Sequence, residues 1–501
     1  IKYKNNNEMA SLSAADASPS NMKKRAQSFV KNFASKKGKV KAKYVRAMAL
    51  NNHHVMRADK KLSAAEAQEF MQEMVDSGNV EYIEVDQMLK PFSTPNDPRF
   101  DDQWHYYEQA GGLNLPTAWD TATGSGVVVA VLDTGYRPHA DLNANILPGY
   151  DMISNLSVAN DGGGRDSDAR DPGDAVAANE CGTNGAQNSS WHGTHVAGTV
   201  AAVTNNGEGV AGVAYNAKVV PVRVLGKCGG LTSDIADGII WASGGSVSGI
   251  PTNSNTADVI NMSLGGSGSC SSTTQNAINI ARSNGTVVVI AAGNDNDNSA
   301  NYNPGNCNGV VNVASVGRNG GRAYYSNYGS NIDVAAPGGA QSFANDSEGV
   351  LSTYNSGSST PSSDSYGFSQ GTSMAAPHVA GVAALIKQAK PDATPDEIES
   401  ILKSTTRSFP ATCTSCGTGI VDAAAAVAAA SGGTTPPTGG DSELINGEAK
   451  TGLSGAANAQ AFYTMTVPSG ATNVTFTMSG GTGDADLYVR AGSKPTTTTY
   501  D

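Results

Sequence analysis

The sequence predicts an α/β fold in which helices cover both faces of a doubly wound, mainly parallel sheet. Five apolar runs support this, at residues 127–132, 218–224, 257–262, 286–292 and 310–315. Such runs are typical of strands buried on both faces, and segments with helical periodicity lie between them. The length of 501 residues, with 16% charged residues, allows several domains and indicates a globular chain.

The first 90 residues differ from the rest in charge and in pattern. They carry a net charge of +6 and the remainder carries −18, as expected of a detachable basic segment on an acidic body. Residues 1–27 are polar, and we expect them to be flexible. Over residues 28–90 the pattern predicts a small α+β domain, with strands at 44–50, 53–57 and 80–85 and a helix that starts at Ser63.

Composition marks two linkers and a third region. Residues 91–96 contain proline and lead into the α/β region, which spans 97–430. Residues 431–441 are rich in Gly, Thr and Pro and form a second linker. Residues 442–501 form a third region, in which the stretches 461–467 and 471–478 alternate apolar and polar side chains and are predicted to be strands.

Four motifs in the α/β region carry reactive side chains. In chain order they offer a carboxylate, an imidazole, an amide and a hydroxyl: Asp133, His192, Asn294 and Ser373. An acyl-transfer hydrolase needs these four parts, as the orienting group, the base, the oxyanion donor and the nucleophile. We therefore predict that these residues form one catalytic site.

The local setting of each residue suits this chemistry. Asp133 ends a predicted buried strand, where open α/β sheets hold their catalytic groups, although an Asp there can also cap a turn. Ser373 precedes an Ala-rich helix whose first-turn N–H groups favour negative charge, although it can also be an ordinary N-cap. His192 and His195 lie three apart without the Glu or the spacing of a zinc-binding His-Glu-x-x-His motif, so we expect His195 to be structural.

The four motifs resemble those of the subtilisin-like serine proteases, the subtilases, and follow the family order Asp, His, Asn, Ser. The resemblance implies that Ser373 is the nucleophile and His192 the general base. It implies that Asp133 orients His192 and that Asn294 donates to the oxyanion. The expected function is therefore a secreted serine endopeptidase that acts through an acyl-enzyme.

The same resemblance extends to the flanking regions. The segment Val80–Asp86 matches the usual end of a subtilase propeptide, so residues 28–90 are expected to inhibit the enzyme and to assist its folding. Cleavage is then expected in the processing linker 91–96. Residues 442–501 resemble the pre-peptidase-type C-terminal domain of secreted enzymes from Gram-negative bacteria, which implies a β-sandwich segment that is incomplete in this chain.

Two glycine-containing segments resemble the substrate-binding walls of the family. We expect both to pair with an extended substrate backbone, because glycine allows another chain to approach closely. Two Gly-rich loops without this role are the alternative. An open pocket lined by glycine suggests a bulky apolar residue before the scissile bond. The residues are Gly229, Gly230, Leu231, Ser263, Leu264, Gly265 and Gly266.

Calcium is the cofactor that the resemblance implies. A first site would use side chains of Asp97, Asp141 and Asn206 with carbonyls of Val203, Glu208 and Val210. A second candidate rests on acidic spacing alone, and a solvated acidic loop is its alternative. Its residues are Asp161, Asp166, Asp168 and Asp171.

The six cysteines lie between residues 181 and 416, and their even number favours disulfides in an exported protein. Resemblance to secreted subtilases pairs Cys181 with Cys228, Cys270 with Cys307 and Cys413 with Cys416. A redox or metal role for the last pair is the alternative; a single Cys-x-x-Cys is weak evidence for zinc.

Other classes of function fit the sequence less well. The Lys-rich stretch 36–43 lacks the aromatic residues and the fold of a nucleic-acid binder, and no stretch approaches 18 apolar residues. A catalytically silent adhesion protein would not need all four reactive residues, and an esterase would carry Gly-x-Ser-x-Gly. We expect a monomer that acts on proteins or peptides, is inhibited by its own propeptide, and binds neither nucleic acid nor membrane.

Overall fold

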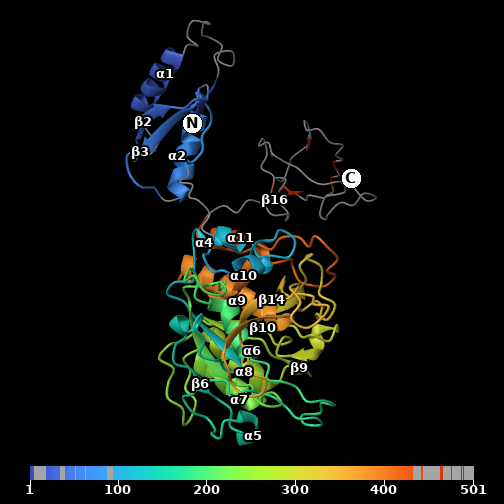
Figure 1. Cartoon of the computed structure of the whole chain (residues 1–501). Coiled ribbons are helices and arrows are strands. Elements are labelled where there is room, and N and C mark those ends of the chain that lie inside the picture. The colour runs from blue at the N-terminus through green and yellow to red at the C-terminus, as the bar shows by residue number, and fades with distance from the viewer. Residues whose placement is uncertain are drawn as a thin grey trace. The chain divides into compact units, whose positions relative to one another are not determined.

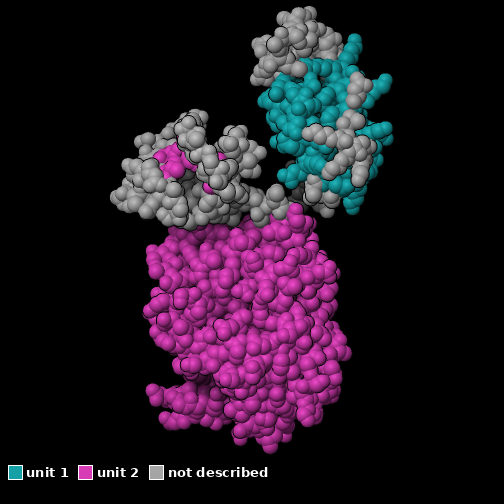
Figure 2. Space-filling view, turned by 180° about the vertical axis from the view of Figure 1, so that it is seen from behind, with its two compact units in different colours: residues 1–92 teal, residues 93–501 magenta. Residues whose placement is uncertain are grey.

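The computed structural model describes residues 1–4, 19–33, 40–50, 52–62, 64–86 and 94–432, together with 442–443, 463–465, 475–476, 487 and 489. Two units, Ile1–Phe92 and Ser93–Asp501, are coloured separately in Figure 2. Most of linker 431–441 and of the predicted C-terminal β domain lies outside the described residues, as do residues 91–93 of the processing linker.

A seven-stranded parallel sheet forms the centre of the larger unit, with strand order β13-β12-β10-β8-β5-β7-β6 (Figure 1). Its strands are β5 Val128–Asp133, β6 Tyr150–Asp151, β7 Lys218–Arg223, β8 Val259–Met262, β10 Val287–Ala291, β12 Val311–Val316 and β13 Val334–Pro337. The five predicted runs are five of these strands, so the α/β prediction is confirmed. The sequence analysis missed β6 and β13, which are short strands at the two edges.

Helices cover both faces of this sheet. Val129 and Val131 of β5 belong to the same core as α6 (His192–Ala201) and α9 (Thr372–Ala389). Ala130 and Leu132 of β5 belong to a second core, with α7 (Thr232–Ala242) and α8 (Ser272–Ser283). Because side chains alternate along a strand, burial on both faces explains why β5 is apolar throughout.

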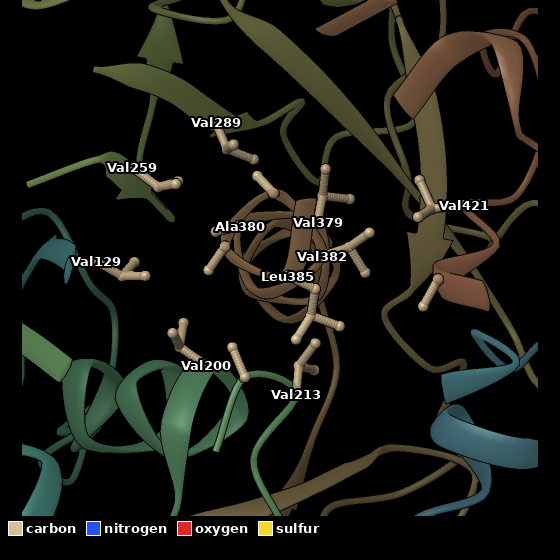
Figure 3. Packing of buried hydrophobic residues seen from close by; sticks show 14 of the residues in the cluster. Val129, Val200, Val213, Val259, Val289, Val379, Ala380, Val382, Leu385 and Val421 are labelled. Carbon is tan, nitrogen blue, oxygen red and sulfur yellow. The ribbon is translucent and has the colours of Figure 1, made fainter. Parts of the chain in front are cut away.

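Helix α9 lies inside the first core. Figure 3 views it along its axis, with Val129, Val259 and Val289 from the sheet on one side and Val200 and Val213 on another. Its small side chains allow close packing. A Cβ on Gly381 would lie 2.5 Å from Cγ1 of Val213, so any larger residue there would clash.

The larger unit contains further helices and strands. An antiparallel hairpin, β14 (Val350–Asn355) with β15 (Asp364–Ser369), leads directly into α9. The sequence analysis did not predict this hairpin. The other α-helices and strands are α3 Trp104–Tyr107, α4 Leu115–Trp119, α5 Leu156–Ala159, β9 Gly266–Ser267, β11 Tyr302–Asn303, α10 Pro395–Ser404, α11 Ala423–Ala430, β16 Ser442–Glu443 and β17 Tyr463–Thr464. Short 3₁₀ turns lie at Phe100–Asp102, Asn143–Asn145 and Ser299–Asn301.

The smaller unit is an α+β structure with its own apolar core. Its elements are β1 Lys2–Tyr3, α1 Pro19–Asn32, β2 Ala42–Ala47, β3 His54–Ala58, α2 Ala64–Asp76 and β4 Val80–Tyr82. Helix α1 differs from the flexible segment expected over 1–27. Ala26 and Val30, four residues apart, are buried in the core of this unit, and tertiary packing therefore stabilises a polar segment as a helix.

The structure joins the cysteines in the three pairs that the family resemblance implies: Cys181–Cys228, Cys270–Cys307 and Cys413–Cys416. The first links the long segment before α6 to the turn before α7. Among the described residues, no helix is both long enough and apolar enough to cross a membrane.

Shortening a buried side chain of α9 should lower the stability of the protein much more than shortening an exposed side chain of a surface helix. Leu385→Ala removes a fully buried side chain and should lower the free energy of unfolding by about 2–5 kcal/mol. Ile280→Ala in α8, where the side chain is 41% exposed, is the matched control and should cost much less. Urea unfolding of both variants measures the difference; equal losses would contradict the assigned core.

Candidate active site

The carboxyl end of β5 places Asp133 below the surface. Its side chain is fully buried, and Oδ1 accepts hydrogen bonds from the Thr134 N–H at 2.7 Å and from Nδ1–H of His192 at 2.8 Å. The strand ends here because the chain turns through Gly135, whose φ is +94°. A Cβ at Gly135 would lie 2.4 Å from the carbonyl oxygen of Ala169, so the turn requires glycine.

His192 is the first residue of α6. Trp191 precedes it in a left-handed conformation, with φ of +47°, and is held there by a 2.7 Å hydrogen bond from its indole N–H to the Gly357 carbonyl. A bulky residue adopts this conformation only where its surroundings impose it. The strain at Trp191 therefore directs the His192 side chain towards Asp133, and the imidazole remains 25% exposed.

Two opposing effects set the pKa of His192. Burial disfavours the charged imidazolium, but the charge of Asp133 and the hydrogen bond to it outweigh burial and raise the pKa above the usual value of a histidine. The hydrogen bond to Asp133 also keeps the proton on Nδ1, which leaves Nε2 as the basic nitrogen when the ring is neutral.

Ser373 lies in the first turn of α9 and is the only residue between Thr372 and Ile386 that is not buried. Pro377 has no N–H, so the Ser373 carbonyl cannot form its helical hydrogen bond. The Ser263 hydroxyl donates to that carbonyl instead, at 2.8 Å. The Ser373 hydroxyl donates to the Ser263 carbonyl at 3.3 Å, so the start of α9 is tied to the end of β8 in both directions.

Two N–H donors flank the same small space beside Ser373. Oδ1 of Asn294 accepts from the backbone N–H and the hydroxyl of Thr372, at 2.8 and 2.9 Å, which fixes the amide and leaves Nδ2 to donate. A Cβ on Gly371 would lie 3.5 Å from Asn294 Nδ2 and 3.5 Å from Ser373 N. First-turn N–H groups have no intrahelical partner, so both donors are available to an oxyanion.

The predicted substrate-binding segments lie on the surface near the ends of β7 and β8. Gly266 is exposed in β9 and pairs with Asn303 of β11, so one side of this segment is already occupied by the protein. The side chain of Ser263 is buried against Ser373, whereas Leu264 is half-buried and Gly265 exposed. On the other segment, Gly230 is exposed, Gly229 is half-buried, and Leu231 at the start of α7 is 45% exposed.

The other histidines near the site have structural partners. Nε2 of His195 lies 3.0 Å from the Val350 carbonyl and 3.1 Å from the Gly367 carbonyl, and burial lowers its pKa to about 4. His378 is hydrogen bonded to the Met374 carbonyl and to His105, both at 2.7 Å. Both rings are therefore neutral side chains that connect α6 and α9 to their neighbours.

Three distant segments meet where the first calcium site is predicted. Oδ2 of Asp97 accepts from the Asn205 N–H at 2.9 Å, and the carboxylate of Asp141 accepts from Asn206 Nδ2 at 2.7 Å and from the Val210 N–H at 2.9 Å. The Val203 N–H donates to the Asp141 carbonyl at 2.7 Å. The structure thus brings the predicted side-chain ligands together.

The two carboxylates of this cluster fit a cation. Oδ1 of Asp97 is buried without a hydrogen-bond partner. Burial raises the pKa of Asp97 and raises that of Asp141 to about 6, and the nearby charge of Asp97 adds to the effect on Asp141. Asn206 Oδ1, a predicted ligand, accepts from the Glu208 N–H at 2.9 Å. Hard oxygen donors of this kind suit calcium.

The second predicted calcium site stays a prediction, and its carboxylates have these partners. Asp161 accepts from Arg223 at 3.0 Å, Asp168 pairs with Arg170, and Asp166 Oδ1 accepts from the Asp168 N–H at 2.7 Å. Asp171 accepts from the Thr134 hydroxyl. Each of these carboxylates has a protein partner, as Asp97 and Asp141 also have. The described part of the chain holds no cluster of three or more His, Cys, Asp or Glu suited to a metal.

The sequence analysis did not predict the role of residues that support Asp133 and His192 through hydrogen bonds. Thr134 connects Asp133 to the backbone of Gly193 and to Asp171. Asp174 accepts from the backbone N–H and the hydroxyl of Ser190, at 2.6 and 2.7 Å, just before His192. Of these supporting side chains, only Thr134 lies within one of the four sequence motifs, because it follows Asp133 directly. Asp174 had no signal in the sequence, and Asp171 was singled out only as a candidate calcium ligand.

Comparisons with known proteins agree with this arrangement. The family model "Subtilase family" matches residues 124–435, and "Bacterial pre-peptidase C-terminal domain" matches 460–501. An "Extracellular protease" of Xanthomonas campestris pv. campestris is 55% identical over 493 residues, covering 97% of this chain and 83% of that protein. An "Extracellular basic protease" of Dichelobacter nodosus is 44% identical over 421 residues, covering 81% and 68%. A solved structure described as a protease from Pseudoalteromonas arctica is 99% identical, with a TM-score of 0.67, and covers 68% of this chain and 100% of that one.

The raised pKa of His192 should depend on Asp133. Asp133→Asn removes the charge that favours the imidazolium, so the pKa of His192 should fall and the ring should stay neutral to lower pH. Imidazole NMR signals followed from about pH 4.5 to about pH 9 in the Ser373→Ala background measure this. His195, whose pKa burial lowers to about 4, should not titrate in the range where His192 does and serves as an internal control. An unchanged His192 titration would contradict the assigned pair.

Proposed function

The chain belongs to the subtilase family and is a serine endopeptidase, and we propose that it hydrolyses proteins through Asp133, His192 and Ser373. The observation that carries the proposal is the 2.8 Å hydrogen bond between His192 Nδ1 and Asp133 Oδ1. It gives the imidazole a fixed orientation, a fixed tautomer and an acceptor for the charge that develops on the ring.

In the proposed mechanism, Ser373 attacks the substrate carbonyl while Nε2 of His192 takes the hydroxyl proton. The Ser373 hydroxyl now donates to the Ser263 carbonyl over 3.3 Å, a long hydrogen bond that substrate binding would replace. His192 then gives the proton to the leaving amine, and an acyl-enzyme on Ser373 remains. Water activated by His192 hydrolyses the acyl-enzyme in the reverse sequence of proton transfers.

Asn294 Nδ2 and the Ser373 N–H would hold the oxyanion of both tetrahedral intermediates. The support is that both donors flank the space beside Gly371. Thr372 fixes the amide of Asn294 before the reaction, so no reorganisation is needed as charge develops. In a subtilisin, loss of an asparagine with this role lowers kcat by about 10²–10³, and we expect a loss of similar size here.

We further propose that residues 28–90 act as an intramolecular inhibitor and are removed by self-cleavage. Support comes from the separate core of the smaller unit and from residues 83–86, which continue beyond β4 without regular structure. Secretion is proposed from the names of the relatives, which are extracellular proteases, and from the three disulfides. Proteins and peptides are the proposed substrates, and a monomer is the proposed state.

Calcium is the proposed stabilising ion. Asp97 and Asp141 would provide the charged ligands, with the loop 203–210 supplying neutral oxygens. The ion would neutralise two buried carboxylates and join three segments of the chain. It supplies structural stability and takes no part in the steps at Ser373.

Ser373→Ala should abolish peptide hydrolysis but leave a folded protein, since the side chain is small and only half-buried. It should also leave residues 1–90 attached, whereas the wild-type enzyme should begin between Leu89 and Asp97. Intact mass, N-terminal sequencing and peptide hydrolysis test the three expectations. Normal processing of the purified Ser373→Ala protein would rule out Ser373 as the nucleophile.

Calcium removal should shorten the life of the enzyme more than it lowers kcat. An ion that binds only the folded state contributes about 2.7 kcal/mol at a hundredfold excess over Kd. Without it, ionising Asp141 becomes costly, so the stability of the calcium-free protein should decrease as pH rises from about 4 to about 6. Inactivation rates with EDTA and with added calcium measure the effect.

Matched variants separate the two predicted calcium sites. Asp141→Ala should lose the response to calcium, and Asp168→Ala in the second loop should keep it. If chelation leaves the half-life of the wild type unchanged, or if Asp168→Ala alone loses the response, the first site is wrong.

A further inference from the structure

Thr134 connects the carboxyl end of β5, which carries Asp133, to the start of α6, which carries His192. Its N–H donates to Asp133 Oδ1 at 2.7 Å. Its hydroxyl oxygen accepts from the N–H of Gly193, the residue after His192, at 3.0 Å. Thr134 is 4% exposed, so solvent does not replace either contact. The position of His192 relative to Asp133 therefore depends on how the Thr134 hydroxyl is oriented.

Asp171 sets that orientation. Its Oδ2 accepts from the Thr134 hydroxyl at 2.7 Å, and its Oδ1 accepts from the Gly173 N–H at 2.8 Å. An ionised carboxylate only accepts hydrogen bonds. Thr134 must therefore direct its hydroxyl hydrogen to Asp171, which keeps a lone pair of the hydroxyl oxygen for the Gly193 N–H.

Asp171 is held as firmly as the groups it contacts. The residue is 1% exposed. Its N–H donates to the Tyr136 carbonyl at 2.8 Å, and its own carbonyl accepts from Arg137 Nη1 at 2.9 Å. Both partners lie in the segment that leaves β5 just after Asp133. The loop around Asp171 is thus fixed to the active-site end of the sheet rather than attached loosely to its surface.

We propose that Asp171 is a positioning residue for the catalytic pair, acting through Thr134. The hydrogen-bond chain runs from the Gly193 N–H to the Thr134 hydroxyl and on to Asp171, and its direction is fixed by the carboxylate. It holds the start of α6 against the end of β5, so that His192 faces both Asp133 and Ser373. This role rests on the proposed function, because it has meaning only if His192 is the general base.

Loss of this hydrogen-bond chain should lower kcat and leave KM nearly unchanged. The hydrogen bonds of Asp171 go to Thr134, Gly173 and the segment after β5, and not to the predicted substrate-binding segments 229–231 and 262–266. Misplacement of a catalytic group by about 1 Å can lower the rate about 100-fold, so we expect Asp171→Asn to lower kcat between about 10- and 100-fold. The Asn amide can donate to Thr134 and reverse the direction of the chain.

The experiment compares the wild type and four variants, all processed, at one mildly alkaline pH with one peptide substrate. Active-site titration corrects kcat for inactive molecules, and thermal unfolding reports stability separately. Asp171→Asn and Thr134→Val should both lower kcat at constant KM, while Thr134→Ser, which keeps the hydroxyl, should restore it. Asp237→Asn is the control: it removes one of the two ion pairs of Arg165, in the same loop, leaves the pair with Asp234, and does not touch Thr134. Its kcat should match the wild type.

Each other outcome counts against the proposal. A wild-type kcat in Asp171→Asn would overturn it, as would equal losses in Asp237→Asn. If Asp171→Asn lowers the thermal stability but not kcat, Asp171 has a purely structural role. The same conclusion follows if Asp171→Asn and Thr134→Val both fail to fold while Thr134→Ser folds. Ser373→Ala measured alongside separates these results from failure of the proposed function, because residual hydrolysis by that variant would refute the triad itself.

Discussion

Burial of α9 is the constraint on which the rest of the larger unit depends. The helix passes through the core, and between Thr372 and Ile386 every residue except Ser373 is buried. It packs against the sheet and against α6 and α11, so it cannot shift without opening several contacts at once. Ser373 therefore gains its fixed position from the hydrophobic core and not from the loop that precedes it.

The reactive groups lie where regular structure ends and backbone groups are free. Asp133 ends β5, His192 begins α6 and Ser373 lies in the first turn of α9. At such ends the backbone N–H groups lack helical partners and can serve chemistry. The cost is that these ends need other polar partners, which Ser263 and Thr134 supply. Because the reactive residues lie at the ends of buried strands and helices, the core holds them rigidly while backbone N–H groups next to them stay free to donate.

The predicted calcium site would stabilise segments of the larger unit that the hydrophobic core does not hold. Asp97 lies near the start of the larger unit, Asp141 follows β5, and Asn206 follows α6. Two buried carboxylates close to each other are unfavourable without a counter-charge. Burial that disfavours the ionised forms of Asp97 and Asp141 is the reason why we propose a cation beside them.

The sequence itself determined the sheet and the reactive residues. Doubly buried strands such as β5 must be apolar throughout, and the chemistry demands particular side chains at Asp133, His192, Asn294 and Ser373, so both leave local patterns. Edge strands such as β6, the hairpin β14–β15 and helix α1 leave weak patterns, because their stability comes from contacts distant in sequence. Acidic spacing also singled out Asp171 as a candidate metal ligand but did not indicate its hydrogen bond with Thr134.

Only the tertiary structure decided which partner each carboxylate has. Asp171 accepts a hydrogen bond from Thr134, Asp161 from Arg223 and Asp97 from the Asn205 N–H, although all three are acidic residues. Hydrogen bonds and charges act through space over a few ångströms, and chain folding brings together residues that are far apart in sequence. A sequence pattern records which side chains are present, whereas their partners follow from how the core packs.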